Sequence, residues 1–151
     1  MPVNIYILKL KDECWYVGKT AGEIEKRVNA HMNGTGSAWT KLHRPICVHE
    51  QFINMSPFDE DKYTKQYMAQ YGIDKVRGGA YVLPMLTDTQ RKTIQREIWG
   101  AQDVCFRCGR EHFVGRCNET TDVYGQAIDE SVAVVMATVD MTGRRRWWWC
   151  C

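Results

Sequence analysis

Five residues within the first 60 positions have side chains that could act together in acid–base and electrostatic catalysis. Tyr6 and Tyr16 lie ten residues apart in two short apolar runs, whereas Arg27 and His31 are four residues apart and share one face of a predicted helix. Glu60 lies in the first turn of a later predicted helix. Phosphodiester hydrolysis needs an activated water, a group that stabilises negative charge and help for the leaving oxygen. One carboxylate can also hold a single Mg²⁺ ion, which keeps most of its waters.

Physical chemistry gives each of these side chains a possible role. The planar guanidinium of Arg27 can bind the non-bridging oxygens of a phosphate. A tyrosine, with an unperturbed pKa of about 10, is a poor base at neutral pH. A nearby cation and arginine would lower that pKa and let the tyrosine deprotonate water. Tyr6 and Tyr16 are both candidates for this base, and the sequence does not choose between them. Lys19 and His31 are expected to assist in phosphate binding or proton transfer.

A second cluster, in residues 105–117, has the spacing of a metal site. The pattern is C-x2-C-x3-H-x4-C. Three thiolates and one imidazole suit a closed tetrahedral Zn²⁺ site, and so short a unit needs the binding energy of the metal to fold. The segment resembles a retroviral-type zinc knuckle, although that pattern has four residues rather than three before its histidine. The predicted zinc ligands are Cys105, Cys108, His112 and Cys117.

The same segment interleaves cations with aromatic side chains. This composition is typical of contacts to phosphates and to stacked bases of single-stranded nucleic acid. The alternative is a structural zinc clip that only caps the protein. The predicted nucleic-acid contacts are Lys19 in the first cluster and Phe106, Arg107, Arg110, Phe113 and Arg116 in the second.

Hydrophobic periodicity and turn signals predict the elements that position these residues. Strands are predicted over residues 4–10, 14–18 and 46–53, the first two as an antiparallel hairpin. Residues 34–45 are predicted to form a loop, and residues 76–82 a turn or bulge that leads into a short strand. The predicted fold class is α/β: a small mixed or antiparallel three-stranded sheet flanked by helices, plus a small zinc knuckle.

Three helices are predicted from helical spacing and capping signals. The first follows a capping box formed by Thr20 and Glu23 and ends at Asn33-Gly34. The second opens with Ser56 as its cap and Pro57 as its first helical residue, and Gly72 ends it. The third spans residues 87–99, with Thr87 and Gln90 as a second capping box.

The order of these motifs resembles the GIY-YIG nuclease superfamily over residues 3–82. Ile5-Tyr6-Ile7 stands for the first motif and Tyr16-Val17-Gly18 for the second; the arginine and histidine of the next helix and the later glutamate follow in order. The resemblance implies that both tyrosine hydroxyls face the active site and that Glu60 holds Mg²⁺ or Mn²⁺. It implies a metal-dependent endonuclease whose catalytic residues are Tyr6, Tyr16, Arg27, His31 and Glu60.

The sequence also departs from the pattern of the superfamily. Asn4 replaces the first glycine, Val17 replaces the central isoleucine of the second motif, and the backbone around Gly78-Gly79 occupies the place of an asparagine. Two stretches, from Gly36 to Thr40 and from Asp61 to Gly79, resemble a subgroup from large DNA viruses and protists that often carries a C-terminal zinc knuckle. The expected domains are a GIY-YIG nuclease domain (1–85), a connecting helix (86–103), the zinc knuckle (104–118) and a weakly structured tail (119–151).

Three functional hypotheses remain open at the level of sequence. The first is a nuclease acting on nucleic acid, with DNA favoured over RNA. The second is a non-catalytic nucleic-acid-binding adaptor, with a decayed nuclease core and a functional knuckle. The third is a zinc-stabilised protein-interaction module, for which the tryptophan-rich stretch near Cys151 is the only hint. Taken singly, each site residue also has a structural explanation, such as tyrosine packing, a Glu23–Arg27 ion pair or a Glu60 side chain that complements the helix dipole.

Composition sets wider bounds on function. The formal net charge of +2 neither supports nor excludes nucleic-acid binding. The N-terminus has no apolar segment typical of a secretion signal, and no apolar run approaches the roughly 20 residues that span a bilayer. We therefore expect an intracellular protein without membrane contact. Seven cysteines, an odd number, argue against a disulfide framework. Cys14 and Cys47 are predicted to be buried thiols, and His43 and His49 to be structural.

Overall fold

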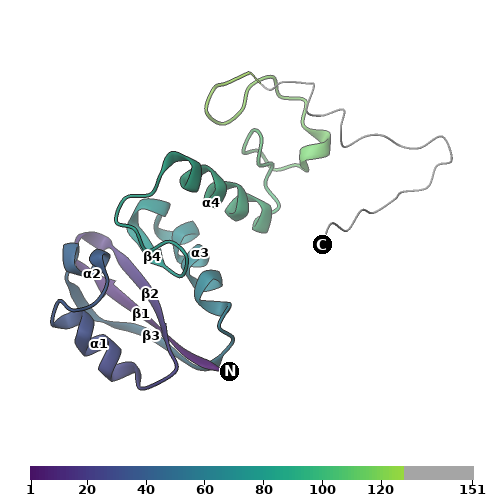
Figure 1. The fold of residues 1–151 in the computed structure, drawn as a ribbon. Coiled ribbons are helices and arrows are strands. Elements are labelled where there is room, and N and C mark those ends of the chain that lie inside the picture. Colours follow the sequence, from purple (N-terminus) through teal and green to yellow (C-terminus); the bar gives the residue numbers. More distant parts are fainter. Residues whose placement is uncertain (128–151) are drawn as a thin grey trace. The chain divides into compact units, whose positions relative to one another are not determined.

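The computed structural model describes residues 1–127, which fall into two compact units on either side of the Ile98–Trp99 boundary (Figure 1). Residues 128–151, which make up most of the predicted tail and include the tryptophan-rich stretch, lie outside the described residues. None of the helices that the structure describes is both long enough and apolar enough to cross a bilayer.

The first unit is built on a four-stranded mixed sheet, so the predicted α/β class is confirmed and the predicted number of three strands is wrong. The strand order is β3-β1-β2-β4. β1 pairs antiparallel with both β2 and β3, and the additional strand β4 pairs parallel with β2. β4 lies within residues 76–82, where a turn leading into a short strand is predicted, but the strand comes first and the turn follows it. The strands are β1 (Val3–Leu10), β2 (Trp15–Thr20), β3 (Pro45–Met55) and β4 (Val76–Gly78).

Helices cover both faces of this sheet because its central strands are apolar on both sides (Figure 1). Ile5, Ile7 and Val17 pack on the side of α3 and α4, whereas Tyr6 and Tyr16 belong to a second buried cluster on the side of α1 and α2. The period-two alternation of a strand therefore sends both tyrosines to one face. The helices are α1 (Ile24–Met32), α2 (Ala38–Leu42), α3 (Asp59–Tyr71) and α4 (Asp88–Ala101).

Two of the predicted helix starts differ from the structure. The Thr20–Glu23 capping box is not formed: Thr20 Oγ1 accepts from the Gly22 amide, and Glu23 precedes α1 without capping it through its side chain. α3 begins at Asp59 rather than at Pro57, since Ser56 caps a tight turn and accepts from the Phe58 amide.

Two predicted helix boundaries agree with the structure. The Thr87–Gln90 capping box is confirmed by reciprocal hydrogen bonds, in which Thr87 N donates to the side chain of Gln90 and Gln90 N donates to the side chain of Thr87. Gly72 ends α3 with a φ of 102°, a backbone conformation that glycine adopts without strain.

The predicted loop over residues 34–45 contains the five-residue helix α2. Ser37 caps it by accepting the Thr40 amide. A serine cap followed by Ala-Trp-Thr is a helix signal, but so short a helix shows no apolar period.

Arg77 is buried with 1% exposure although it is charged, and it holds the segment after β4. Its guanidinium donates four hydrogen bonds of 2.6–2.9 Å to backbone carbonyls. It also stacks on the indole of Trp39 in α2, at 4.5 Å from the ring centroid. Hydrogen bonding of every polar group makes burial of such a charge tolerable. The acceptors are the carbonyl oxygens of Ile73, Val76, Leu83 and Pro84.

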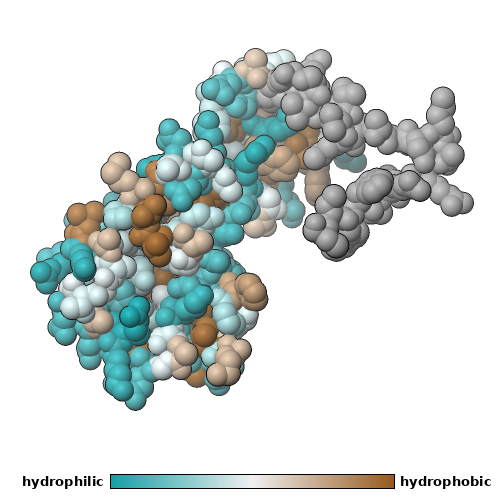
Figure 2. Space-filling model, viewed as in Figure 1, coloured by the Kyte–Doolittle hydropathy of each residue, from teal (hydrophilic) through white to brown (hydrophobic). Residues whose placement is uncertain are grey.

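The face of the molecule drawn in Figure 2 carries both apolar and polar residues. Figure 2 shows hydrophobic residues scattered among hydrophilic ones on the visible face. Short 3-10 helices connect the main elements at Lys11–Glu13 and Ile73–Lys75. Cys14 is buried as predicted, but Cys47 is exposed, because it lies on the edge strand β3.

The second unit consists of turns around a cysteine–histidine cluster, with a 3-10 helix at Val114–Arg116. Gly109 N donates to Cys105 O and Cys105 N donates to Arg110 O, which closes a tight turn at Gly109, where φ is +76°. Residues beyond the predicted end of the knuckle join this unit. Val123 N donates to Arg107 O, and Thr121 forms a bridge with Ala127.

Candidate active site

The strand register brings Tyr6 against α1. Tyr6 in β1 lies opposite Gly18 in β2, and Tyr16 precedes that glycine by two residues on the same face. A side chain at Gly18 would begin 2.5 Å from the Tyr6 hydroxyl oxygen, so only glycine leaves room for this ring. The glycine of the second motif is therefore required by the packing of the tyrosine of the first.

His31 links the two tyrosines to α1 and α2. Its Nε2 lies 3.0 Å from the Tyr6 hydroxyl, and its Nδ1 lies 2.9 Å from Thr40 Oγ1. The imidazole centroid is 4.7 Å from that of Tyr16 and 5.8 Å from that of Tyr6. The structure thus brings three of the predicted site residues into direct contact.

Burial and charge keep His31 neutral. It is 1% exposed, and burial, together with repulsion by the Arg27 guanidinium, lowers its pKa to about 4. A neutral imidazole has one donor and one acceptor nitrogen. His31 is therefore a hydrogen-bonding link at neutral pH, not a cation that contacts phosphate.

The pKa values of the two tyrosines differ from the expectation. Burial raises the pKa of Tyr6, although hydrogen bonding and charge from Arg27 oppose the change. Burial, with smaller contributions from Tyr6 and Glu60, raises the pKa of Tyr16 to about 12. Arg27 alone does not produce the lowered pKa that the sequence suggested, because desolvation outweighs it. Tyr6 is fully buried and Tyr16 keeps 7% exposure, which distinguishes the two hydroxyls.

Glu60 approaches the same cluster at the open end of β2. β4 stops opposite Val17, so the β2 residues from Gly18 onward have no strand partner on that side. Glu60, in the first turn of α3, forms an ion pair of 2.9 Å with Lys19 in this gap. Its charge acts on the pKa of both tyrosines, as does that of the exposed Arg27. The five predicted catalytic residues and Lys19 thus share one neighbourhood.

Two simple structural explanations for these charged residues are weakened. Glu23 forms its ion pair with Lys26, at 3.1 Å, rather than with Arg27. The Glu60 side chain is 12% exposed and turned toward Lys19 on another element, so it does more than complement the dipole of its own helix.

The sequence analysis gave neither Thr40 nor Arg77 a role in the site, although both lie in stretches that resemble the viral and protist subgroup. Thr40 contacts the candidate site through His31, and Ser37 of the same segment hydrogen bonds to Tyr16. Arg77 stacks on the ring of Trp39, which lies between Ser37 and Thr40 in the sequence. The Ser37 cap signal could have indicated α2, but nothing in the local sequence distinguishes Arg77 from a surface arginine.

Asp61 and the glycine pair lie where an asparagine was missing from the expected pattern. Asp61 Oδ1 accepts a hydrogen bond from Ala80 N at 2.9 Å, and a side chain at Gly79 would overlap the Asp61 carboxylate. A side chain at Gly78 would overlap Val17 O. The turn after β4 therefore packs tightly on α3, but no amide side chain from it reaches the tyrosines.

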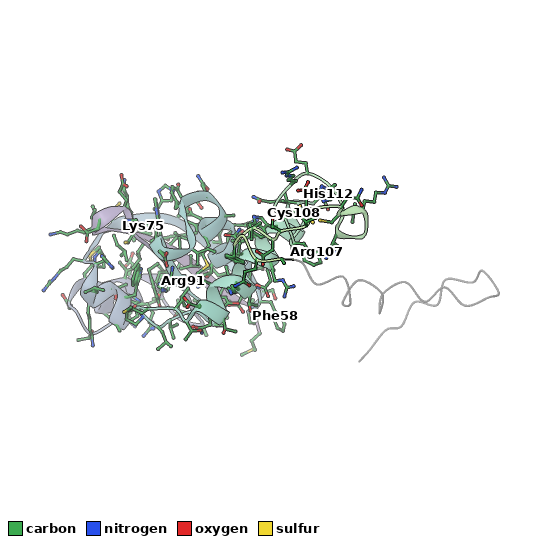
Figure 3. All side chains as sticks on the ribbon, turned by 90° about the horizontal axis from the view of Figure 1, so that it is seen from above. Phe58, Lys75, Arg91, Arg107, Cys108 and His112 are labelled. Atoms are coloured by element: carbon green, nitrogen blue, oxygen red, sulfur yellow. The ribbon has the colours of Figure 1, made fainter. Side chains whose placement is uncertain are left out.

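The four predicted zinc ligands converge in the second unit. One ligand atom from each of Cys105, Cys108, His112 and Cys117 lies within 4.8 Å of every other, as one tetrahedral ion requires. Figure 3 labels Cys108 and His112, whose Sγ and Nε2 atoms are 3.5 Å apart. Burial alone would raise the pKa of the Cys105 thiol, but hydrogen bonds from the backbones of Cys108 and Arg107 lower it overall. This donor set could hold zinc.

The aromatic and cationic side chains of this unit differ in solvent exposure and in ion pairing. Phe113 is 73% exposed and Phe106 37%. Arg110 forms an ion pair of 2.6 Å with Glu119, whereas Arg116 is exposed at the end of the 3-10 helix. Arg107, also labelled in Figure 3, is half-buried.

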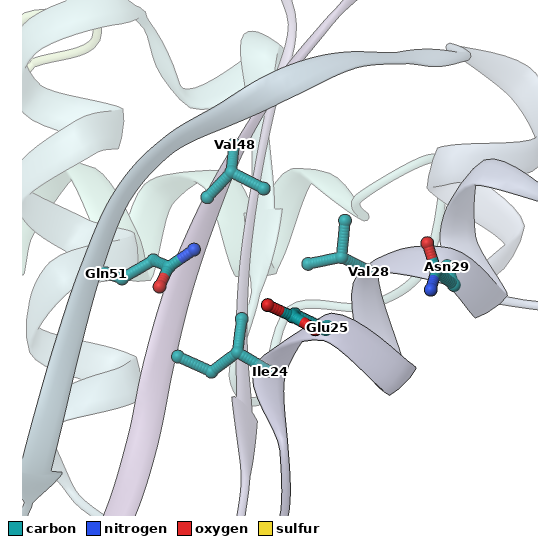
Figure 4. A pocket seen from close by; sticks show the side chains of 6 residues that line it. All are labelled: Ile24, Glu25, Val28, Asn29, Val48 and Gln51. Carbon is teal, nitrogen blue, oxygen red and sulfur yellow. The ribbon is translucent and has the colours of Figure 1, made fainter.

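Other candidate features of the first unit fall outside the tyrosine–histidine cluster. A hollow of ≈ 200 Å³ between α1 and β3 is lined by none of the predicted site residues (Figure 4). His43 pairs with Asp12, and His49 packs edge-on against Trp15, so both have the structural surroundings expected for them. The hollow is lined by Ile24, Glu25, Val28, Asn29, Val48 and Gln51.

The chain is similar over partial stretches to three bacterial proteins of the UPF0213 group. UPF0213 protein YazA of Bacillus subtilis is 44% identical over 41 residues, which are 27% of this chain and 40% of that protein. A UPF0213 protein of Staphylococcus saprophyticus is 44% identical over 55 residues, or 36% of this chain and 61% of that protein. A third, from Clostridium perfringens, is 48% identical over 42 residues, or 28% and 44%.

The similarity thus spans 40–61% of the lengths of these relatives. No family model matches the chain, and no solved structure matches it significantly. The names of the relatives specify no activity.

The buried, neutral His31 makes folding stability depend on pH. The unfolded chain, with an ordinary histidine pKa of 6.5, binds a proton that the folded protein does not bind until about pH 4. Acidification below pH 6.5 should therefore destabilise the fold, by about 2 kcal/mol at pH 5. Urea titrations at pH 7 and pH 5 measure this loss. Between the two pH values, the free energy of unfolding should fall by about 2 kcal/mol more in the wild type than in His31→Gln. Equal losses in the two proteins would contradict the assignment.

Proposed function

We propose that the chain is a metal-dependent nuclease of the GIY-YIG type that hydrolyses phosphodiester bonds of nucleic acid, with DNA the favoured substrate. The supporting observation is the convergence of Tyr6, Tyr16 and His31 at contact distance, with Arg27 and Glu60 acting electrostatically on both tyrosines. Packing alone explains buried tyrosines. It does not explain why an arginine and a glutamate from two different helices direct their charges at the same two hydroxyls.

Exposure favours Tyr16 as the residue that takes the proton of the attacking water. Tyr6 is fully buried and bonded to His31, whereas Tyr16 retains 7% exposure. At a pKa of about 12 Tyr16 is not a base at neutral pH on its own. Additional positive charge is needed beside it, and Arg27 already contributes in that direction. Arg27 and Lys19 would bind the non-bridging oxygens of the scissile phosphate, as exposed cations next to the cluster.

Glu60 is suited to hold a divalent cation. Its carboxylate is largely buried and binds a cationic group, the Lys19 ammonium, at 2.9 Å. The Glu60 carboxylate thus favours positive charge at the place that the Lys19 ammonium occupies. A Mg²⁺ or Mn²⁺ ion held by Glu60 would supply charge that lowers the pKa of nearby hydroxyls and stabilises the leaving oxygen. Lys19, 44% exposed on a flexible stem, would then turn from Glu60 to the phosphate.

The second unit would bind Zn²⁺ and help to hold nucleic acid. The convergent Cys₃His donor set supports zinc. The exposed Phe113 and Arg116 support stacking on a base and contact with a phosphate, with Phe106 and Arg107 as further candidates. The expected likeness to a subgroup from large DNA viruses and protists stays a prediction; the three relatives compared above are bacterial.

A non-catalytic nucleic-acid-binding adaptor is the second candidate. The raised pKa of both tyrosines and the lack of an amide side chain from Gly78-Gly79 favour it over catalysis. An adaptor would bind nucleic acid through the second unit and cleave nothing. The presence of Arg27 and Glu60 beside both tyrosines favours the nuclease.

Removal of either charge should abolish or strongly reduce cleavage without loss of the fold. Glu60→Gln should eliminate metal-dependent turnover, and Arg27→Ala should lower it about 10²–10³-fold, as loss of a positioned transition-state stabiliser does. Two matched controls remove comparable charges that do not belong to the site. Glu97→Gln removes a carboxylate that forms an ion pair of 2.8 Å with Lys65, and Lys26→Ala removes the cation of the residue that precedes Arg27 and pairs with Glu23. Steady-state cleavage of a labelled substrate measures the effect. Near wild-type rates for Glu60→Gln and Arg27→Ala would contradict the catalytic roles proposed for Glu60 and Arg27.

Zinc should be a structural component of the second unit. Elemental analysis of the purified protein should find one zinc per chain, and the double variant Cys108→Ser with His112→Ala should contain none. We expect a chelator to abolish the amide protection of residues 105–117, because the metal supplies the folding energy of so short a unit. A zinc-free protein with unchanged amide exchange in that segment would contradict a structural site.

The arginines of the second unit offer a matched test of nucleic-acid contact. Arg116→Ala should weaken binding and reduce the slope of log affinity against log salt by about one unit, as loss of one phosphate contact does. Arg110→Ala should have a smaller effect, since Glu119 already neutralises that guanidinium. Fluorescence anisotropy with a short single strand at several salt concentrations measures both slopes. Identical slopes for wild type and Arg116→Ala would make the unit a structural clip.

A further inference from the structure

Helix α2 contacts the candidate active site on one side and is anchored on the other. Thr40 Oγ1 lies 2.9 Å from His31 Nδ1. The neighbouring Trp39 is 4% exposed, and its indole N–H donates to Trp15 O at 3.0 Å while Arg77 stacks on its ring. Two independent anchors for so short a helix indicate that the position of Thr40 is held firmly.

Thr40 ends a series of hydrogen bonds that begins at Arg27. Arg27 hydrogen bonds to the Tyr6 hydroxyl, which lies 3.0 Å from His31 Nε2; His31 Nδ1 contacts Thr40 Oγ1, which donates to Ser37 O at 3.0 Å. The first member of this series, a guanidinium, can only donate. The last, a backbone carbonyl, can only accept.

These two ends fix the direction of every bond between them. The single Thr40 proton goes to Ser37 O, so Thr40 Oγ1 accepts from His31 Nδ1–H. The lone pair of Nε2 then accepts the Tyr6 proton, and the Tyr6 oxygen is left with lone pairs for Arg27. The other histidine tautomer would place two donors, Nε2–H and the Arg27 guanidinium, on the Tyr6 oxygen and leave Nδ1 to compete with Ser37 O for the Thr40 proton.

The imidazole ring has little freedom to escape this arrangement. A side chain at Gly36 would overlap the His31 ring, so the ring lies directly against the backbone there. Ser37 Oγ lies 3.2 Å from Thr40 Oγ1 and accepts the Thr40 amide, which holds the threonine from the N-terminal side of α2. The segment from Gly36 to Thr40 therefore supplies both the backbone packed against the His31 ring and the hydroxyl that contacts Nδ1.

We infer that Thr40 is a positioning residue that fixes His31 as the Nδ1–H tautomer, and that it thereby leaves the Tyr6 oxygen free to hold Arg27 on the phosphate side of the site. The consequence for cleavage rests on the proposed nuclease function. The tautomer itself can be measured without any turnover, so the failure of one hypothesis is distinguishable from the failure of the other.

The direct test is the ¹⁵N spectrum of the histidine side chains in the full-length protein. His31, assigned by its absence from His31→Gln, should show a protonated Nδ1 and an unprotonated Nε2 at neutral pH. In Thr40→Val, a variant of the same shape without the hydroxyl, the ring should shift toward the Nε2–H tautomer. Thr40→Ser, which restores a hydroxyl, should return the wild-type pattern. A protonated Nε2 in the wild type would overturn the inference, whether or not Thr40→Val folds.

Kinetics on a labelled nucleic acid supply the second readout. Thr40→Val should lower kcat about 10- to 100-fold with little change in KM, as loss of a partner that fixes a histidine tautomer does elsewhere, and Thr40→Ser should restore most of the rate. Thr93→Val is the matched control, since it removes a hydroxyl that donates to a backbone carbonyl at 2.9 Å on an exposed part of α4. A folded Thr40→Val with the wild-type tautomer and rate would overturn the inference. Absence of cleavage by the wild type, with the expected tautomers, would refute the nuclease and leave Thr40 as the residue that fixes His31.

Discussion

The pairing of Tyr6 with Gly18 across β1 and β2 is the constraint on which the candidate site depends. The register places Tyr6 and Tyr16 on one face of the sheet, and the missing side chain at Gly18 leaves the space that the Tyr6 ring occupies. A shift of one strand against the other by one residue would place the two tyrosines on opposite faces of the sheet. The buried hydrogen bond from Tyr6 to His31 then fixes α1 on this face, and α1 carries Arg27 to the same place.

Glu60 reaches the site through a second topological feature, the shortness of β4. Because β4 ends opposite Val17, the last residues of β2 have an open edge to which the first turn of α3 comes close. Lys19 on that edge and Glu60 on α3 pair across it. Helices from opposite faces of the sheet can thus contribute an arginine and a glutamate to one pair of tyrosines. The low exposure of the tyrosines raises their pKa, so additional positive charge is needed before either acts as a base.

Features encoded by adjacent residues could be predicted from the sequence, whereas features that depend on distant contacts could not. The Thr87–Gln90 capping box and the Gly72 helix end depend on a few neighbouring residues and agree with the structure. The Thr20–Glu23 box has the same pattern, but Thr20 belongs to the end of β2 and bonds within a turn.

Distant contacts account for most of what the sequence did not indicate. Thr40 becomes important through a residue nine positions earlier, and Arg77 through four carbonyls and an indole that only the fold assembles. Cys47 has apolar neighbours in the sequence but lies on an edge strand, so it is exposed. The zinc ligands follow from local spacing, and the structure brings their four ligand atoms together.

The most direct test of the central claim is a cleavage assay of the wild-type, zinc-loaded protein. Labelled duplex, branched and single-stranded DNA, with RNA counterparts, would be incubated with Mg²⁺ or Mn²⁺ and, in parallel, in metal-depleted buffer to which neither ion is added. Our account predicts cleaved products from at least one substrate only when the divalent cation is present, with DNA cleaved faster than RNA. Binding of these substrates by the folded protein without any cleavage, at every metal concentration, would contradict the nuclease and support the adaptor.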